Sequence, residues 1–173
     1  MNALTDHQTA FGNPDTLLDV PLVQAIAELA KTRGDVRFTL GGGILFDTPI
    51  TKVERLALPA VRSRSMVFLD LPQDRFNSAL VKDAAFQGIV NRFTVPHARD
   101  GYRLVVIPLT GRLTAAQLTA IAGVAETFGH GALRVTPDVS IRLPNVPAAL
   151  LKPLFVALTK AGLVGSPASR LAA

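Results

Sequence analysis

The pattern in residues 101–164 constrains the fold more than any other part of this sequence. Residues 102–108 are mainly β-branched and aliphatic and end at a proline, which predicts a largely buried strand. Residues 133–136 and 139–143 alternate apolar and polar side chains on either side of a proline–aspartate turn. This alternation predicts a β-hairpin that carries arginines on its more solvated face.

Two helices complete this segment, and each has its own boundary signals. Thr114 with Gln117 three residues later predicts a capping box at the start of the first helix, and Gly129 predicts a left-handed end. The second helix is expected from about Lys152, because Pro153 is tolerated in a first turn but costs about 3 kcal/mol in a helix interior. The apolar stripe of the first helix has helical spacing and consists of Leu118, Ile121, Ala122, Ala125 and Phe128.

The order β-α-β-β-α predicts the α+β class, as a ferredoxin-like half-domain whose helix pair covers one face of a small antiparallel sheet. We assign residues 99–165 to this half-domain and residues 16–98 to an N-terminal α/β portion that packs with it. Residues 1–15 are expected to be mobile and residues 166–173 to form a tail.

The N-terminal portion is predicted from weaker signals, and no clear repeat of the half-domain is evident in it. Asp19 and Gly34 bound a predicted helix. The glycine run at residues 41–43 favours a hairpin over a phosphate-binding loop, because a phosphate loop opens into a helix. The other elements predicted here are strands at residues 36–40, 44–46, 50–58 and 66–71 and a helix from Asp74 to about Phe86.

Residues 111–146, GRLTAAQLTAIAGVAETFGHGALRVTPDVSIRLPNV, resemble the ferredoxin-like half-domain of the siroheme nitrite/sulfite reductase family, which precorrin-3B synthase shares. The helix start G-R-L-T-x-x-Q-L and the helix end A-E-x-F-G-x-G carry the resemblance. The strand L-R-x-T and the following I-x-L-x-x-V extend it. The resemblance covers about a third of the chain and implies the same fold for it.

Three departures from the family pattern concern its cofactors. In the family, L-R-x-T is followed by a polar run that faces the tetrapyrrole, whereas Thr136 is followed here by residues 137–140, Pro-Asp-Val-Ser. Residues 105–107 stand where the family tends to carry an arginine that faces the bound anion, and this chain has no cysteine for the iron–sulfur cluster. The resemblance therefore implies a retained fold with no cofactor expected, and siroheme or another tetrapyrrole remains the alternative.

Arginines are the best candidates for a binding site. Arg103, Arg112, Arg134 and Arg142 are the candidate contacts to an anion. If Arg134 and Arg142 share one face of the hairpin, they are suited to hold a carboxylate or phosphate. A solvated strand face is the simpler interpretation of the same arginines.

The other polar residues do not form a recognisable catalytic group. His7, His97 and His130 lack the spacing of metal ligands, and we interpret them as structural. Arg62 and Arg64 form the one local basic cluster, for which a solvated connection is the favoured interpretation over an anion or partner contact.

Composition excludes several classes of function. The absence of cysteine excludes disulfides, thiol catalysis and thiolate metal sites. The net charge is +5, but the arginines are scattered and few aromatic residues are available for stacking, which disfavours nucleic-acid binding. No run of 18 apolar residues predicts a membrane span, and the N-terminus does not resemble a signal peptide, so we expect a cytoplasmic protein.

Two functions from different classes follow from these observations. The first is a non-catalytic accessory or binding subunit that acts through protein–protein contacts, with a protein partner or as a homodimer, in a larger and redox-related assembly. The alternative is a component that binds a siroheme-like tetrapyrrole or another anionic small molecule for a reductase or a tetrapyrrole-pathway enzyme. With no recognisable catalytic constellation, we do not expect the chain to be an enzyme on its own.

Overall fold

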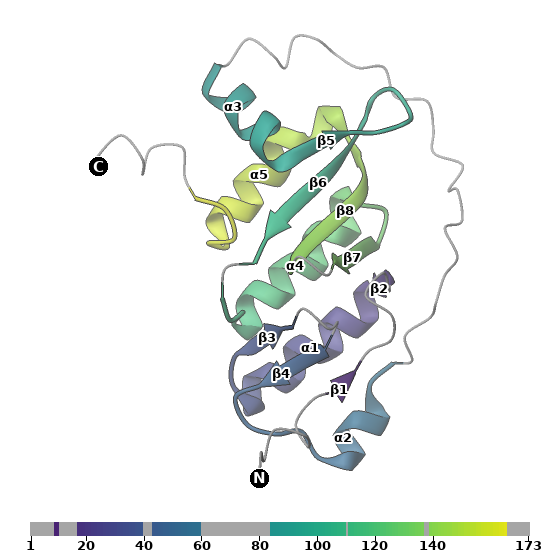
Figure 1. The fold of residues 1–173 in the computed structure, drawn as a ribbon, viewed down its shortest axis with the longest axis vertical. Coiled ribbons are helices and arrows are strands. Elements are labelled where there is room, and N and C mark those ends of the chain that lie inside the picture. Colours follow the sequence, from purple (N-terminus) through teal and green to yellow (C-terminus); the bar gives the residue numbers. More distant parts are fainter. Residues whose placement is uncertain are drawn as a thin grey trace.

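The computed structural model describes residues 9–10, 17–39, 43–59, 84–109, 111–136 and 139–165 (Figure 1). The described helices are α1 (Val20–Arg33), α2 (Lys52–Ala57), α3 (Ala84–Phe93), α4 (Ala115–Phe128) and α5 (Leu151–Lys160), with a 3₁₀ turn at Ala148–Leu150. The described strands are β1 (Thr9–Ala10), β2 (Leu17–Asp19), β3 (Val36–Phe38), β4 (Gly43–Phe46), β5 (Thr94–Pro96), β6 (Tyr102–Pro108), β7 (Ala132–Thr136) and β8 (Ser140–Pro147).

The strands form two antiparallel sheets. The larger has five strands in the order β2-β7-β8-β6-β5, and the smaller has three in the order β1-β4-β3. The segment β6-α4-β7-β8-α5 is the predicted β-α-β-β-α unit, so the α+β class and the ferredoxin-like arrangement are confirmed. β5 extends its sheet beside β6, and β2 extends it beside β7.

Helix α4 begins as predicted and ends differently. Thr114 Oγ1 accepts a hydrogen bond from the Gln117 amide at 3.2 Å, and Gln117 Oε1 accepts one from the Thr114 amide at 3.0 Å. The prediction of a left-handed Gly129 is wrong, because its φ is −113° and the left-handed residues are His130 and Gly131. Glycine at 129 avoids a tight contact, since a Cβ there would lie 3.1 Å from the Ala125 carbonyl oxygen.

One hydrophobic core lies between the larger sheet and its helices. Figure 1 shows α4 and α5 behind this sheet. Val105 and Leu143 are fully buried on the helix side, and Leu118 and Leu154 cover them from α4 and α5. The same core includes residues of α1, β3 and β4, so the N-terminal elements pack with the half-domain.

The N-terminal elements repeat the half-domain, which the sequence pattern did not make evident. β1-α1-β3-β4-α2 corresponds to β6-α4-β7-β8-α5, since β4 lies between β1 and β3 as β8 lies between β6 and β7, and β2 corresponds to the segment at Leu113. The β3–β4 hairpin pairs Arg37 with Leu45, and adding 97 to both numbers gives the β7–β8 pair Arg134 and Arg142. The buried positions of the helices also correspond, with an offset of 95: Val23, Ile26, Ala27 and Ala30 in α1, and Leu118, Ile121, Ala122 and Ala125 in α4.

The two repeats pack as a pseudo-two-fold pair. α1 lies against α4, and strand pairing crosses between the repeats in both directions. β2 of the first repeat pairs with β7 of the second through Leu18 and Leu133. At the equivalent position, Val36 exchanges two backbone hydrogen bonds with Leu113, at 2.8 and 2.6 Å. Such reciprocal pairing is the signature of a two-fold relation.

Two predicted elements of the N-terminal portion are corrected. Residues 50–58 form no strand: Thr51 caps α2, and the Thr51–Glu54 capping box favours a helix over the predicted strand. Residues 74–83 of the helix predicted from Asp74 to about Phe86 lie outside the described residues; the described helix α3 extends past Phe86 to Phe93 and is followed by β5. The predicted strand at 66–71, and Arg62 and Arg64, lie outside the described residues.

A substitution in either helix of the pair tests whether the repeats unfold together. We expect Ile26→Ala and Ile121→Ala each to lower the free energy of unfolding by about 2–5 kcal/mol, since both isoleucines are fully buried. Urea denaturation followed by circular dichroism should show a single transition in each case. Val156→Ala, at an exposed position of α5, should change the free energy by less than about 0.5 kcal/mol. Two separate transitions would contradict a shared core.

Candidate anion site on the outer face of the sheet

We call the side of the five-stranded sheet that faces away from α4 and α5 the outer face. Arg134 on β7 is directly opposite Arg142 on β8, and Arg142 is opposite Val106 on β6. Val105 and Ile107, the neighbours of Val106, are buried toward the helices. Since side chains alternate along a strand and opposed residues share a face, Val106 and both arginines lie on the outer face.

Arg134 and Arg142 form a pair of like charges on adjacent strands. Directly opposed residues on antiparallel strands have Cα atoms about 5 Å apart, and like charges on such a pair of residues destabilise a sheet. Both side chains are half-buried, and the Nε atom of each is shielded from solvent. The Nε of Arg134 has no hydrogen-bond partner among the described residues. A planar anion placed against this pair would offset both costs, because guanidinium groups bind carboxylates in a bidentate manner.

An apolar strip lies beside the arginine pair on the outer face. Leu104 is paired with Val95 on β5, and it lies two residues before Val106 on β6. Leu104 and Val106 are half-buried, and Val95 is 49% exposed. The outer face therefore offers a ligand a cationic part over β7 and β8 and an apolar part over β6 and β5.

The turn between β7 and β8 holds the arginine-bearing strands in register. Thr136 Oγ1 and Ser140 Oγ lie 2.7 Å apart, and both residues are buried. Val139 has a φ of 56°, in the left-handed region that is costly for a β-branched side chain. Its carbonyl oxygen accepts a hydrogen bond from the Leu109 amide, which ties the turn to the end of β6.

The other two predicted site residues lie elsewhere. Arg112 forms an ion pair with Asp47, next to the bridge between Val36 and Leu113, so it joins the two repeats. Arg103 is at the start of β6, three residues and about 10 Å from the Val106 row, and a β-bulge intervenes. The structure thus brings together Arg134 and Arg142 of the four predicted residues.

Arg37 is a cationic residue that the sequence analysis did not single out. It occupies the position in β3 that Arg134 occupies in β7, and its side chain is exposed. Its partner on β4 is Leu45, which occupies the position that Arg142 occupies on β8. The first repeat therefore has one cation where the second repeat has the arginine pair. The signal was present in the sequence: V-R-F-T at residues 36–39 parallels L-R-V-T at residues 133–136.

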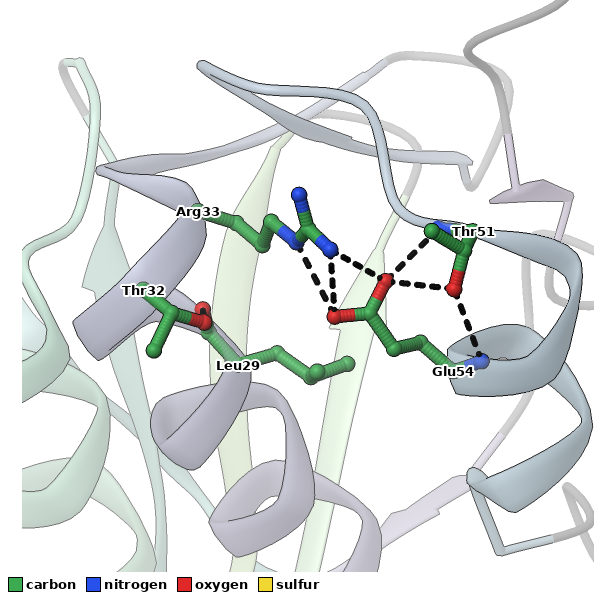
Figure 2. Close-up of polar contacts among 5 residues, drawn as sticks. All are labelled: Leu29, Thr32, Arg33, Thr51 and Glu54. Carbon is green, nitrogen blue, oxygen red and sulfur yellow. Dashed lines mark hydrogen bonds and ion pairs between the residues drawn. The ribbon is translucent and has the colours of Figure 1, made fainter.

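A second polar cluster, around Glu54, is satisfied internally (Figure 2). Arg33 at the end of α1 donates from Nε and Nη2 to the Glu54 carboxylate at 2.8–3.0 Å. Thr51 donates to the same carboxylate from its amide and its hydroxyl, each at 2.7 Å. The Thr51 amide and hydroxyl, followed by Arg33, lower the pKa of Glu54 from 4.5 to about 2. This cluster fastens α2 to α1, and the Glu54 carboxylate is fully engaged by Arg33 and Thr51.

The described histidines support the chain locally. His97 Nδ1 accepts a hydrogen bond from the Arg99 amide at 2.9 Å. The ring centroids of His97 and His130 lie 5.9 and 6.5 Å from the ring centroid of Tyr102. His7 lies outside the described residues. Within the described ranges, no group of three or more His, Cys, Asp or Glu residues is placed to hold a metal ion. No helix in the same ranges is long and apolar enough to cross a membrane.

The fold and the site define a ferredoxin-like α+β protein that presents a cationic pair on the outer face of its sheet. Among protein families, the model described as nitrite/sulfite reductase ferredoxin-like half domain matches residues 96–161. This segment of the chain, which includes β6-α4-β7-β8-α5, therefore carries that half-domain, and the resemblance inferred from residues 111–146 is confirmed. No curated protein matches the chain.

Replacement of Val139 tests the strain in the turn beside the arginines. We expect Val139→Gly to be more stable than Val139→Ala by about 1 kcal/mol, because both lose the same valine packing but glycine adopts a positive φ without steric cost. Urea denaturation of the two variants gives the difference in their free energies of unfolding, which measures the cost of the positive φ at residue 139. Equal stabilities would show that the turn carries no such strain.

The Glu54 cluster makes stability depend on pH in a defined window. Because the folded protein lowers the pKa of Glu54, its contribution to stability is complete above pH 4.5 and is lost as the pH falls from 4.5 to about 2. The difference in melting temperature between the wild type and Glu54→Gln should therefore shrink over this interval. Glu28→Gln, which removes an exposed partner of Lys31, is the control. A difference in melting temperature between the wild type and Glu54→Gln that stays constant from pH 4.5 to about pH 2 would contradict the lowered pKa of Glu54.

Proposed function

We propose that this protein is a non-catalytic binding subunit whose outer face holds carboxylate groups of a small-molecule ligand. The observation that carries the proposal is the opposed pair of Arg134 and Arg142, with the shielded Nε of Arg134 lacking a partner among the described residues. One carboxylate can accept hydrogen bonds from both guanidinium groups, which converts a repulsive pair into a binding site.

The surroundings of the pair favour a flat ligand with an apolar part. Leu104 and Val106 offer apolar area beside the arginines, which suits a ring system whose edge bears carboxylates. A tetrapyrrole has this chemistry, and the half-domain match makes a siroheme-like macrocycle the first ligand to test. Siroheme supplies redox chemistry at its iron when bound, and the role we assign to this chain is to hold and orient the carboxylates. With no cysteine, the chain has no thiolate for an iron–sulfur cluster.

Absorption spectroscopy of the protein mixed with siroheme tests this function directly. We expect a Soret band that remains with the protein through gel filtration. Arg134→Ala and Arg142→Ala should each weaken binding about tenfold or more, since a hydrogen bond to a charged group contributes about 1.5–3 kcal/mol. Both titrations should be made on folded protein of unchanged far-ultraviolet circular dichroism.

Two arginine variants are matched controls for this titration. Arg112→Ala removes a cation that is paired with Asp47, and Arg92→Ala removes an exposed cation that stacks on Phe93. Both should bind siroheme as the wild type does. The proposed ligand class would be refuted if the wild type showed no Soret band after gel filtration. It would also be refuted if Arg134→Ala and Arg142→Ala bound siroheme as tightly as the wild type.

A second function, an accessory subunit that acts through protein–protein contacts, is favoured by a different observation. Helix α2 exposes two large apolar residues, Val53 and Leu56, that contribute nothing to the core. Exposed apolar residues on an ordered element are typical of interaction surfaces. Both functions describe a binding subunit, and they use separate surfaces, so variants on one surface leave the other intact.

A further inference from the structure

Helix α2 is fixed in place although none of its residues is buried. At its first turn, Glu54 is held by the fork of Arg33 and by the capping residue Thr51 (Figure 2). After its last turn, Leu58 packs against the core. A helix of six residues is unstable by itself, so these two anchors determine its position. Its outward side chains are consequently presented at a fixed place.

The outward side chains of α2 form what we call the α2 patch: Lys52, Val53, Arg55 and Leu56. Val53 and Leu56 are 77% and 76% exposed, the highest values among the large apolar residues of the described chain. They are three positions apart and share one face of the helix. In the second repeat, the equivalent helix α5 buries four apolar residues in the core, namely Leu151, Leu154, Phe155 and Leu158. Val53 and Leu56 of α2 are thus apolar side chains that do not pack against the core.

The two exposed charged side chains of α2 are both cations. Lys52 and Arg55 are exposed, and neither has an ion pair among the described residues. Glu54, the acidic residue of α2, is turned toward Arg33 and neutralised there. The patch therefore combines two apolar side chains with two cations, on a chain whose net charge is +5.

We propose that the α2 patch docks an acidic amphipathic segment of a partner protein; this inference rests on the accessory-subunit function proposed above. The partner's apolar residues cover Val53 and Leu56, and its carboxylates pair with Lys52 and Arg55. A second copy of this chain is disfavoured, because a two-fold contact would bring the same cations together. A lipid surface is disfavoured as well, because a helix of six residues has too little apolar face for stable insertion.

Two synthetic peptides serve as probes of the full-length protein. Both have leucine at helical i, i+3, i+4 and i+7 positions, and the remaining positions are glutamate in one and lysine in the other. Fluorescence anisotropy should show binding of the glutamate peptide that weakens with salt. Val53→Ala with Leu56→Ala should weaken it about tenfold or more, because alanine removes the apolar contacts but maintains the helix. Lys52→Glu with Arg55→Glu should reverse the preference toward the lysine peptide.

The control variants separate this surface from the outer face. Val156→Ala removes a 64% exposed valine that lies between two lysines of α5, and it should leave peptide binding unchanged. Arg134→Ala should also bind the glutamate peptide normally, while the α2 variants should retain siroheme binding. Failure of one function then leaves the other untouched.

Four outcomes would overturn the proposal. The first is equal binding of the two peptides, and the second is wild-type peptide affinity in the double alanine variant. The third is a lower melting temperature in that variant, which would mean that this chain itself covers the patch. The fourth is an α2-dependent contact of another kind: a dimer in sedimentation, or binding to phosphatidylserine–phosphatidylcholine vesicles in preference to the glutamate peptide.

Discussion

The packing of α1 on α4 is the interaction on which the rest of the structure depends. Each helix buries one apolar stripe, and the two stripes occupy corresponding positions of the two repeats. Once the helices are paired, β2 is placed beside β7, and Val36 is placed beside Leu113. Strand edges that would otherwise expose unpaired backbone groups are thereby covered by the other repeat. A half-domain in isolation would lack both the second helix stripe and these edge partners.

Two charged clusters among the described residues differ in how the cost of a half-buried cation is offset. Arg33 is paired within the chain, because its Nε and Nη2 donate three hydrogen bonds to the Glu54 carboxylate, which also accepts one from the Thr51 amide. Arg134 and Arg142 are opposed on adjacent strands, where two like charges repel, and the Nε atom of Arg134 has no hydrogen-bond partner among the described residues. The first arrangement stabilises the fold, whereas the second is suited to an anion from outside.

Departures from the symmetry of the repeats coincide with the proposed binding surfaces. Arg142 has Leu45 as its counterpart, so the cationic pair exists in the second repeat alone. α5 buries one apolar face in the core, whereas its counterpart α2 buries no residue and exposes Val53 and Leu56. Where the repeats agree, the shared residues are mainly buried and serve packing. Where they differ, the residues are exposed or half-buried, which leaves them able to contact other molecules.

Local sequence determined the elements whose signals lie within a few residues. The Thr114–Gln117 capping box, the strand ending at Pro108 and the arginine-bearing hairpin were all predictable, because caps, turns and alternation act over one or two turns of chain. Tertiary structure decided what depends on distant partners. The capping box at Thr51 competed with an apparent strand pattern, and Arg33, 21 residues away, helps to hold that turn. The relation between the repeats emerged from strand register and helix packing, since few identical residues are needed to bury equivalent apolar stripes. That Arg134 and Arg142 meet, while Arg112 pairs with Asp47, followed from register and from contacts across the two repeats, which no local pattern encodes.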